Sequence, residues 1–178
     1  MNNLLKIDYK LSYKIFLLSN RLHFTRKYFS ILLKFYGLII FLILIIIYPE
    51  NIELKAISVV MVIAFTYIVI DNLLKKIIKR ERPKYSNISN SSYSFPSSHS
   101  FNSMLLCLIF LKLTPNLSLI DQLFCLALSI FVGITRIIFG YHYISDVLGG
   151  IILAIVCLLY TSDAADDLLC VDLGGRRI

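Results

Sequence analysis

Two apolar segments of the chain meet at the stretch TRIIFGYHYISDVLGG (residues 135–150), where residues 119–140 end and residues 144–160 begin. Within it, His142 and Asp146 lie four residues apart, a spacing that places two side chains on one face of a helix. An ionisable pair beside segments of membrane length is costly unless it has a function. The pair therefore predicts a polar site beside a membrane. The alternative is an aspartate at a helix start next to an interfacial histidine.

Apolar segments of this kind recur along the whole chain, which has 178 residues and is 58% hydrophobic. This length is typical of one domain. Several segments are shorter than the ~20 residues of an ideal membrane span. The four prolines fall between the segments or at their edges, as breaks between helices would. We predict an all-α fold, an integral membrane helical bundle with about five transmembrane helices at residues 29–48, 56–74, 100–113, 119–140 and 144–160.

The two ends of the chain differ from this central part. The first 28 residues interleave apolar residues with lysines, which is typical of a helix lying at the bilayer surface. The stretch CLLYTSDAADDLLCVDLGGRRI (residues 157–178) resembles a translated sequencing adapter. We therefore expect an N-terminal interfacial segment at residues 1–28, a membrane domain with a truncated last helix at residues 29–160, and an artefactual tail at residues 161–178.

A cationic cluster follows the second apolar segment, in DNLLKKIIKRERP (residues 71–83). Lys75 and Arg82 are seven residues apart, so in a helix that continues to Pro83 both point to the same side. Two cations on one face suit an anion with several oxygens, and arginine adds a planar fork of donors. The alternative is a set of headgroup anchors or topology signals, which are common among basic residues at membrane helix ends.

A loop rich in Ser, Asn and Tyr then leads into the third apolar segment through Pro96, Ser97, Ser98 and His99. Amides and hydroxyls at a helix N-terminus form an anion site, and we expect the amides of Ser97 and Ser98 to face it. His99 can donate a proton there, since the ordinary pKa of histidine lies near neutral pH. The alternative is an ordinary polar loop with a capping serine.

The alternation of the five predicted spans places these clusters on one side of the membrane. Residues 75–83, 84–99 and 136–143 all emerge at the same face. We therefore expect two histidines, three cations and a carboxylate to converge there, with Arg136 as the third cation. Such a group of side chains would suit an anion with several oxygens.

The clusters resemble the motifs of the type 2 phosphatidic acid phosphatase family, which shares its core with vanadium haloperoxidases and bacterial acid phosphatases. Ser98 occupies a position where the family has glycine, and Thr135 a position where it has serine. The resemblance covers roughly residues 25–156. Three motifs carry it in chain order: Lys-x6-Arg-Pro at residues 75–83, Pro-Ser-Gly-His at residues 96–99, and Ser-Arg-x5-His-x3-Asp at residues 135–146.

This resemblance implies a covalent mechanism. His142 attacks phosphorus and forms a phosphohistidine, Asp146 orients the imidazole, and His99 protonates the leaving oxygen. We expect a carboxylate oxygen of Asp146 within hydrogen-bond reach of the far ring nitrogen of His142, at about 2.6–3.2 Å if the geometry of the empty site is tight. The phosphate-binding residues that the resemblance implies are Lys75, Arg82, Ser97, Ser98 and Arg136.

The resemblance also implies partners and location. No metal or other cofactor is expected, because fixed cations take the place of Mg²⁺ and the sequence has no acidic cluster that would hold one. The expected substrate is a phospholipid or isoprenoid phosphate in the bilayer, with undecaprenyl diphosphate as first choice and phosphatidate or phosphatidylglycerophosphate as alternatives. No nucleic acid partner is expected, and the oligomeric state stays open. A non-catalytic lipid-phosphate carrier is the alternative from a different class.

The membrane side of the site is predicted differently by two arguments. Similarity to undecaprenyl-diphosphate phosphatases implies the outer face of a bacterial cell membrane. The excess of lysine and arginine around the three clusters places the same face in the cytoplasm by the positive-inside rule. We expect the outer face, because basic residues near a phosphate site confound that rule.

Overall fold

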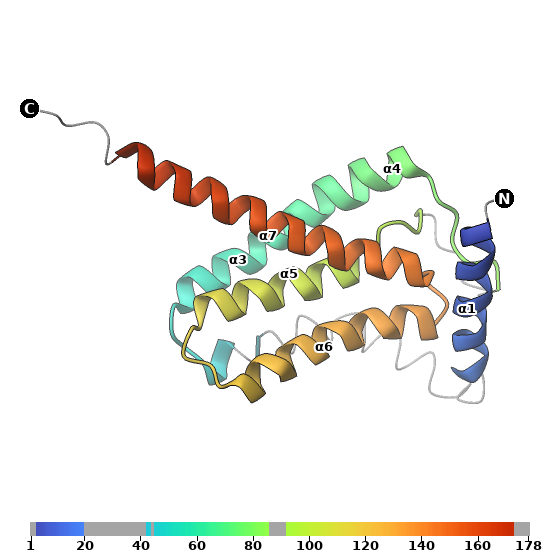
Figure 1. Cartoon of the computed structure of the whole chain (residues 1–178), viewed down its shortest axis with the longest axis horizontal. Coiled ribbons are helices and arrows are strands. Elements are labelled where there is room, and N and C mark those ends of the chain that lie inside the picture. Colours follow the sequence, from blue (N-terminus) through green and yellow to red (C-terminus); the bar gives the residue numbers. More distant parts are fainter. Residues whose placement is uncertain (1–2, 20–41, 44, 86–91, 173–178) are drawn as a thin grey trace, which may run out of the picture.

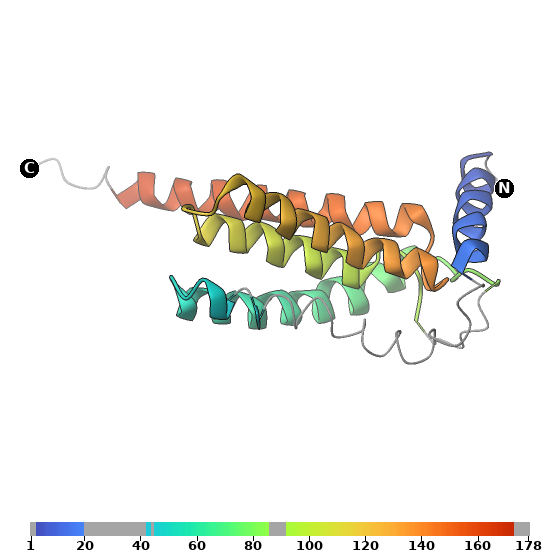
Figure 2. The ribbon, with the colours of Figure 1, turned by 90° about the horizontal axis from the view of Figure 1, so that it is seen from below.

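The regular structure of the described part of the chain is helical throughout. The computed structural model describes residues 3–19, 42–43, 45–85 and 92–172, with side chains as far as residue 161. Figures 1 and 2 show the long helices side by side, with a short N-terminal helix across one end of them. In chain order the elements are α1 (Asn3–Ser19), α3 (Ile52–Phe65), the π-helix η2 (Thr66–Leu74), α4 (Lys75–Ile78), α5 (Ser98–Leu113), α6 (Leu119–Ile138) and α7 (Ile144–Asp172).

The predicted all-α membrane bundle is confirmed. Three helices of the described part are long and apolar enough to cross a bilayer, and α5 is a shorter apolar helix of 16 residues. One of the three is continuous through α3, η2 and α4. These four helices match the last four predicted spans. The three long ones are Ile52–Ile78, Leu119–Ile138 and Ile144–Thr161.

Two predicted boundaries are only partly visible. Most of the first predicted span, residues 29–48, lies outside the described residues, as do residues 20–28 of the predicted interfacial segment. At the other end, α7 continues without a break past residue 160 as far as Asp172. The division of the chain into three parts therefore stays a prediction.

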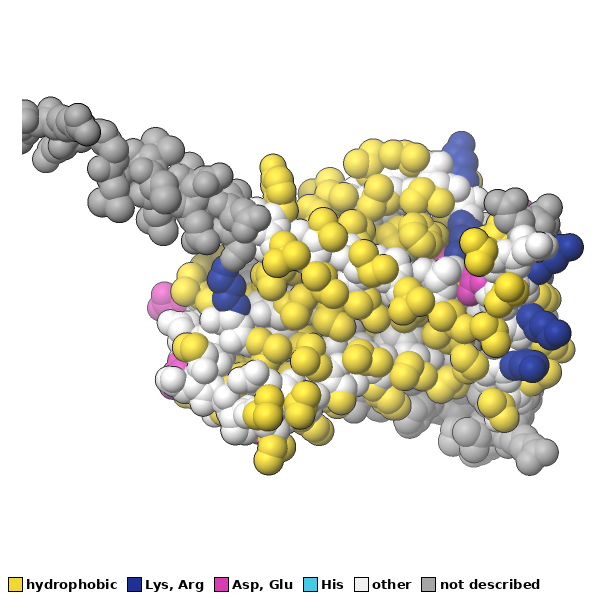
Figure 3. Space-filling view, in the orientation of Figure 1, with side chains coloured by type: hydrophobic (Ala, Val, Ile, Leu, Met, Phe, Trp, Pro, Cys, Tyr) yellow, Lys and Arg dark blue, Asp and Glu magenta, His cyan; other side chains and the backbone are white. Residues whose placement is uncertain are grey.

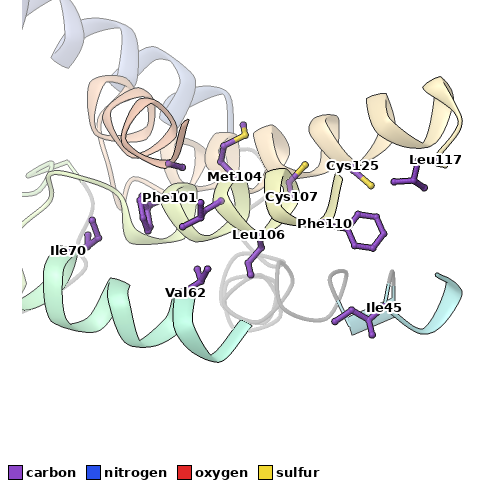
Figure 4. Close-up of a cluster of buried hydrophobic side chains, with 12 residues drawn as sticks. Ile45, Val62, Ile70, Phe101, Met104, Leu106, Cys107, Phe110, Leu117 and Cys125 are labelled. Atoms are coloured by element: carbon purple, nitrogen blue, oxygen red, sulfur yellow. The ribbon is translucent and has the colours of Figure 1, made fainter. Parts of the chain in front are cut away.

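Helix α5 forms the centre of the bundle. It packs against α3, α6 and α7, and its buried side chains point in several directions rather than along one stripe. Phe101 and Phe110 are fully buried, and Figure 4 shows them with Val62 of α3 and Cys125 of α6 in one apolar cluster. A helix that is apolar all round is stable only when neighbours cover it on every side.

The outer faces of the bundle are also apolar. Figure 3 shows hydrophobic side chains over the length of the helices, with lysines and arginines gathered at the end where α1 lies. Side chains such as Met61, Ile120 and Ile152 are more than half exposed. An apolar surface of this extent is stable in contact with lipid hydrocarbon rather than with water.

Helix α1 lies across one end of the bundle (Figure 1). Its rings of Tyr9, Tyr13 and Phe16 pack around Tyr85, with centroid distances of 5.5, 5.3 and 4.9 Å. If the bundle helices cross a bilayer, a helix in this orientation runs along the bilayer surface. The interfacial role of residues 1–28 stays a prediction.

We expect Gly150→Ala to lower the thermal midpoint of unfolding by several °C. Gly150 lies where α7 crosses the start of α5, and an added Cβ would stand 2.7 Å from the carbonyl oxygen of Ser97. Backbone cannot yield as a flexible side chain does, so the helices must separate, at about 1–3 kcal/mol. In a chain with Cys157 and Cys170 replaced by serine, a thiol-reactive dye reports exposure of the buried Cys107 and Cys125 and so measures the midpoint. Leu148→Ala, on the exposed face of α7, is the control and should shift it less.

Candidate active site

The three predicted clusters meet at the end of the bundle where α1 lies. Lys75 Nζ donates to Ser98 Oγ at 2.8 Å, and the backbone amide of Ser97 donates to the carbonyl of Asp146 at 3.0 Å. Arg82 Nη1 donates to the carbonyl of Tyr141 at 2.9 Å. These contacts join α4 and the segment that follows it to the start of α5, to the turn after α6 and to the start of α7. The predicted convergence is therefore present in the structure.

The turn after α6 places the histidine of the third motif. Gly140 adopts a φ of 73°, a left-handed conformation that glycine tolerates and that ends the helix. The amides of Tyr141 and His142 then donate back to the carbonyl of Arg136, at 3.0 and 3.3 Å. His142 is thus held by the backbone directly beside an arginine of its own motif.

Asp146 lies behind His142, and both side chains are buried. Asp146 Oδ2 lies 3.4 Å from His142 Nδ1 and accepts the amide of Tyr143 at 2.9 Å. This separation is longer than the 2.6–3.2 Å expected for a tight empty site, and Nδ1 has no well-aligned hydrogen bond to any described residue. Asp146 Oδ2 thus lies near both the amide of Tyr143 and the ring of His142, and it is closer to the amide. The pair is in place but not tightly bonded.

The other ring nitrogen of His142 faces the cationic side of the site. His142 Nε2 lies 3.4 Å from Arg82 Nη1. Arginine can only donate, so Nε2 is the acceptor and Nδ1 carries the proton toward Asp146. Burial lowers the pKa of His142; Asp146 opposes the shift and Arg82 adds to it. The imidazole is therefore neutral at pH 7, with its lone pair directed to where an anion would bind.

Arg82 reaches this point from an extended segment rather than from a helix. The prediction of a helix continuing to Pro83 is wrong, because α4 ends at Ile78. Lys79 then adopts a left-handed conformation with φ of 51°, and its amide caps the helix by donating to the carbonyl of Lys75 at 2.9 Å. The guanidinium of Arg82 is held by Ser92, through Nε to its carbonyl and Nη2 to its hydroxyl, both at 2.8 Å.

Lys75 lies in a small polar triangle. Its Nζ donates to Asp71 Oδ1 at 2.7 Å and to Ser98 Oγ at 2.8 Å, and Ser98 Oγ donates to Asp71 Oδ1 at 2.7 Å. An ammonium group has three protons, so one is left for a phosphate oxygen. Sequence reasoning missed Asp71, although a carboxylate in an apolar helix, one turn before Lys75, was a signal for it.

Ser97 acts mainly in the structure of the site. Its hydroxyl accepts bonds from the amide and hydroxyl of Ser100, at 3.4 and 2.9 Å, and so caps α5. The prediction that its amide faces the anion is wrong, because that amide is bonded to the Asp146 carbonyl. The hydroxyl proton of Ser97 can still be donated to a ligand. The amide of Ser98, at the first position of α5, stays a predicted phosphate donor.

Arg136 and His99 complete the group. Arg136 is buried in the last turn of α6, with its guanidinium 5.8 Å from the ring centroid of Tyr141. His99 is half-buried in the first turn of α5. Partial burial lowers the pKa of His99, and the charge of Arg136 lowers it further, followed by His142, Lys75 and Arg82. His99 is thus neutral in the empty site, and a bound phosphate dianion would favour its protonated form.

The chemistry of these donors suits an anion. Lys75, Arg82 and Arg136 supply fixed positive charge, and Ser97 supplies a hydroxyl. Among the residues that the structure describes, His, Cys, Asp and Glu form no group of three or more that could hold a metal ion. Thr135, which replaces the serine of the third motif, donates instead to the carbonyl of Val132 at 2.6 Å, inside α6.

Two further residues, which were missed from the sequence, lie behind the motif residue Asp146. Arg80 donates to Asp146 Oδ1 at 2.7 Å, and Asp8 of α1 accepts from Arg80 at 2.7 Å. In the sequence, Arg80 is one of several basic residues at a helix end, and nothing distinguishes it from its neighbours. Asp8 lies more than 60 positions before the first motif.

Comparisons with known proteins agree with this geometry. A sequence model of the PAP2 superfamily matches residues 55–168. Phosphatidylglycerophosphatase B of Bacillus subtilis (strain 168) is 33% identical over 95 residues, which are 49% of this chain and 47% of the relative. The match thus spans about half the length of that curated relative.

One solved structure shares the fold. It is the crystal structure of a transmembrane PAP2-type phosphatidylglycerolphosphate phosphatase from Bacillus subtilis, with a TM-score of 0.65 and 23% sequence identity. The similarity covers 94% of this chain and 88% of the other. At this identity it supports the architecture of the bundle and not the substrate.

Proposed function

The chain belongs to the PAP2 superfamily, and from this membership we propose that it is a membrane phosphatase acting on a lipid phosphate. One observation carries the proposal: Nε2 of a neutral His142 faces Arg82 at 3.4 Å while Asp146 lies behind its Nδ1. A binding site for phosphate needs only the cations. The imidazole backed by a carboxylate is what nucleophilic catalysis adds.

In the first step, His142 Nε2 attacks phosphorus. A nitrogen–phosphorus bond forms while the bond from phosphorus to the leaving oxygen breaks, and His99 gives that oxygen a proton. Lys75, Arg82 and Arg136 stabilise the charge on the phosphoryl oxygens. Asp146 accepts the Nδ1 proton in a hydrogen bond and balances the positive charge of the phosphorylated imidazole.

In the second step, water replaces His142 on phosphorus. Neutral His99, having lost its proton in the first step, accepts a proton from the attacking water. Phosphate leaves and His142 returns to its neutral form. The lowered pKa of His99 suits both steps. The bound dianionic substrate favours the protonated form of His99, and the departure of phosphate favours loss of that proton.

A lipid substrate follows from the position of the site. Apolar side chains cover the face of the bundle that Figure 3 shows, with lysines and arginines at the end where α1 lies. The polar site lies at that same end. A headgroup can reach the cations from there while its chains stay in hydrocarbon. The first substrate proposed is phosphatidylglycerophosphate, which the name of the curated relative supports. Undecaprenyl diphosphate is the second candidate, because the same cations would hold a diphosphate.

Phosphate release tests this function. Purified protein in mixed micelles is offered phosphatidylglycerophosphate, phosphatidate and undecaprenyl diphosphate, and free phosphate is measured. The proposal expects release from at least one lipid, with the highest kcat/KM on phosphatidylglycerophosphate. Saturable binding of these lipids without any release would identify a lipid-phosphate carrier instead. A higher kcat/KM on undecaprenyl diphosphate would favour the substrate that the sequence resemblance gave as first choice.

Chelation and vanadate are expected to act in opposite ways. EDTA should leave the rate unchanged, because fixed cations perform the charge stabilisation that Mg²⁺ supplies elsewhere. Vanadate should inhibit competitively, since it takes the five-coordinate geometry of the phosphoryl transition state. The measurement is initial rate against inhibitor concentration. A rate lost on chelation and restored by Mg²⁺ would contradict this chemistry.

The outer face of the membrane is the proposed side of the site. Exposed lysines at the same end, including Lys6, Lys10 and Lys14 of α1, count for the cytoplasmic side by the positive-inside rule. Lys84, whose side chain is 83% exposed, gives a test. Lys84→Cys in a chain without its four native cysteines should react with an impermeant thiol reagent on intact cells. Reaction only after lysis would place the site in the cytoplasm.

A further inference from the structure

The buried carboxylate of Asp146 is held from behind by Arg80. Arg80 Nη1 donates to Asp146 Oδ1 at 2.7 Å, whereas Oδ2 accepts the amide of Tyr143 and faces His142. One oxygen is thus bound to a guanidinium, and the other is left for the imidazole. Asp146 is fully buried, and a buried carboxylate needs a counter-charge of this kind.

Arg80 is in turn held by α1. Its Nη2 donates to Asp8 Oδ2 at 2.7 Å, and its guanidinium lies 4.3 Å from the ring centroid of Tyr143. The side chains of Arg80 and Asp8 are only 19% and 12% exposed, so water screens the pair weakly. A guanidinium is a rigid planar fork. Its anchoring at Asp8 therefore fixes the direction from which it meets Asp146.

Helix α1 also caps the helix that carries Asp146. Ser12 Oγ accepts the amide of Ile144 at 3.0 Å, and Asp8 Oδ1 accepts the amide of Ser145 at 3.2 Å. The hydroxyl of Ser145 donates to Asp8 as well. The first amides of a helix have no partner within it, and here another helix provides one. Both the start of α7 and the counter-charge of Asp146 thus depend on α1.

We propose that Asp8 and Arg80 are positioning residues of the phosphatase reaction, forming a relay from α1 to Asp146 that keeps Oδ2 directed at His142. This inference rests on the proposed function. Neither residue belongs to the group that faces the phosphate, and both act through Asp146. Without the relay the carboxylate turns to other donors, and His142 loses its orienting partner. The cations that bind phosphate are unchanged, so kcat falls while KM stays.

Steady-state kinetics on Asp8→Asn and Arg80→Lys test the relay. We expect each to lower kcat by about 10- to 100-fold, the size typical of outer partners of a catalytic group, with KM within about threefold of wild type. Glu81→Gln is the matched control, since this exposed neighbour of Arg80 pairs with Lys84 at 3.3 Å and should leave kcat unchanged. In an Asp146→Asn background, Arg80→Lys should cause no further loss.

A second measurement does not depend on turnover. NMR of ¹⁵N-labelled histidine reports which ring nitrogen of His142 carries the proton. We expect the Nδ1–H form in wild type and a mixture of both forms in Asp8→Asn and Arg80→Lys. If wild type releases no phosphate from any lipid, the proposed function fails, while the change of tautomer still tests the relay.

Two results would overturn the relay. One is wild-type kcat and an unchanged tautomer in both variants. The other is a loss of kcat from Arg80→Lys that is equally large in the Asp146→Asn background, which would show a general structural role. Thermal midpoints are measured in parallel. If Asp8→Asn does not fold, the kinetics and the tautomer are measured on Arg80→Lys alone. This variant keeps the positive charge and removes the planar guanidinium.

Discussion

Replacing His142 with alanine is expected to abolish phosphate release, with kcat lowered by about three to six orders of magnitude. The variant lacks the nitrogen that attacks phosphorus, and His99, at the start of α5, serves the leaving group and does not take its place. The cations remain, so binding should persist. Equilibrium binding of vanadate measures this directly, and a Kd within about tenfold of wild type is expected.

The matched control for this variant is His23→Ala. It removes the one histidine outside the three motifs, at a position outside the described residues. Rapid quench with ³²P-labelled lipid adds a direct reading of the covalent step, since wild type should carry acid-labile phosphate and His142→Ala none. Turnover by His142→Ala at the wild-type rate would remove the covalent mechanism.

Asp146→Asn should give the second largest loss, a fall in kcat of about 100- to 10,000-fold. The substitution keeps the shape of the side chain and removes the charge that balances the phosphorylated imidazole. It also offers an amide donor to His142, which can turn the ring to the wrong tautomer. KM should change little, because Asp146 does not face the phosphate. Initial rates across a range of lipid concentrations separate the two parameters.

Asp121→Asn is the control for charge alone. Asp121 lies in the first turn of α6, at the other end of that helix from Arg136, where its carboxylate accepts from Ser118 at 2.7 Å. Its replacement should leave kcat within about twofold of wild type. An Asp146→Asn protein with normal kcat and raised KM would show that Asp146 supports binding. It would contradict the proposed role of Asp146 in orienting His142 and balancing its charge.

The motif residues and the fold class can be predicted from the sequence because both depend on local spacing. His142 and Asp146 are one helical turn apart, and apolar segments of membrane length alternate the sides on which their ends emerge. Both properties are periodic along the chain. They are sufficient to predict a helical membrane bundle with Lys75, His99, Arg136 and His142 at one end, and the structure places them there.

The helical spacing of the sequence predicted the wrong structure where the backbone leaves the helical conformation. The segment from Lys75 to Pro83 has the pattern of a continuing helix, yet Lys79 takes a left-handed conformation and the helix ends one residue before it. The pattern does not contain this turn, because its stability comes from contacts with distant parts of the chain. Arg82 is tied to Ser92, and Arg80 to Asp146. Local propensity is a weak prior against such contacts.

The sequence by itself therefore determined the class of fold, the end of the bundle that holds the site and the residues predicted to face a phosphate. Only the tertiary structure showed that a second arginine, Arg80, lies behind Asp146. It also brought Asp8, 138 positions earlier in the chain than Asp146, into contact with the same arginine. The reason is physical: periodicity specifies which face of an element is polar, whereas the partner of a buried charge depends on which separate elements pack together.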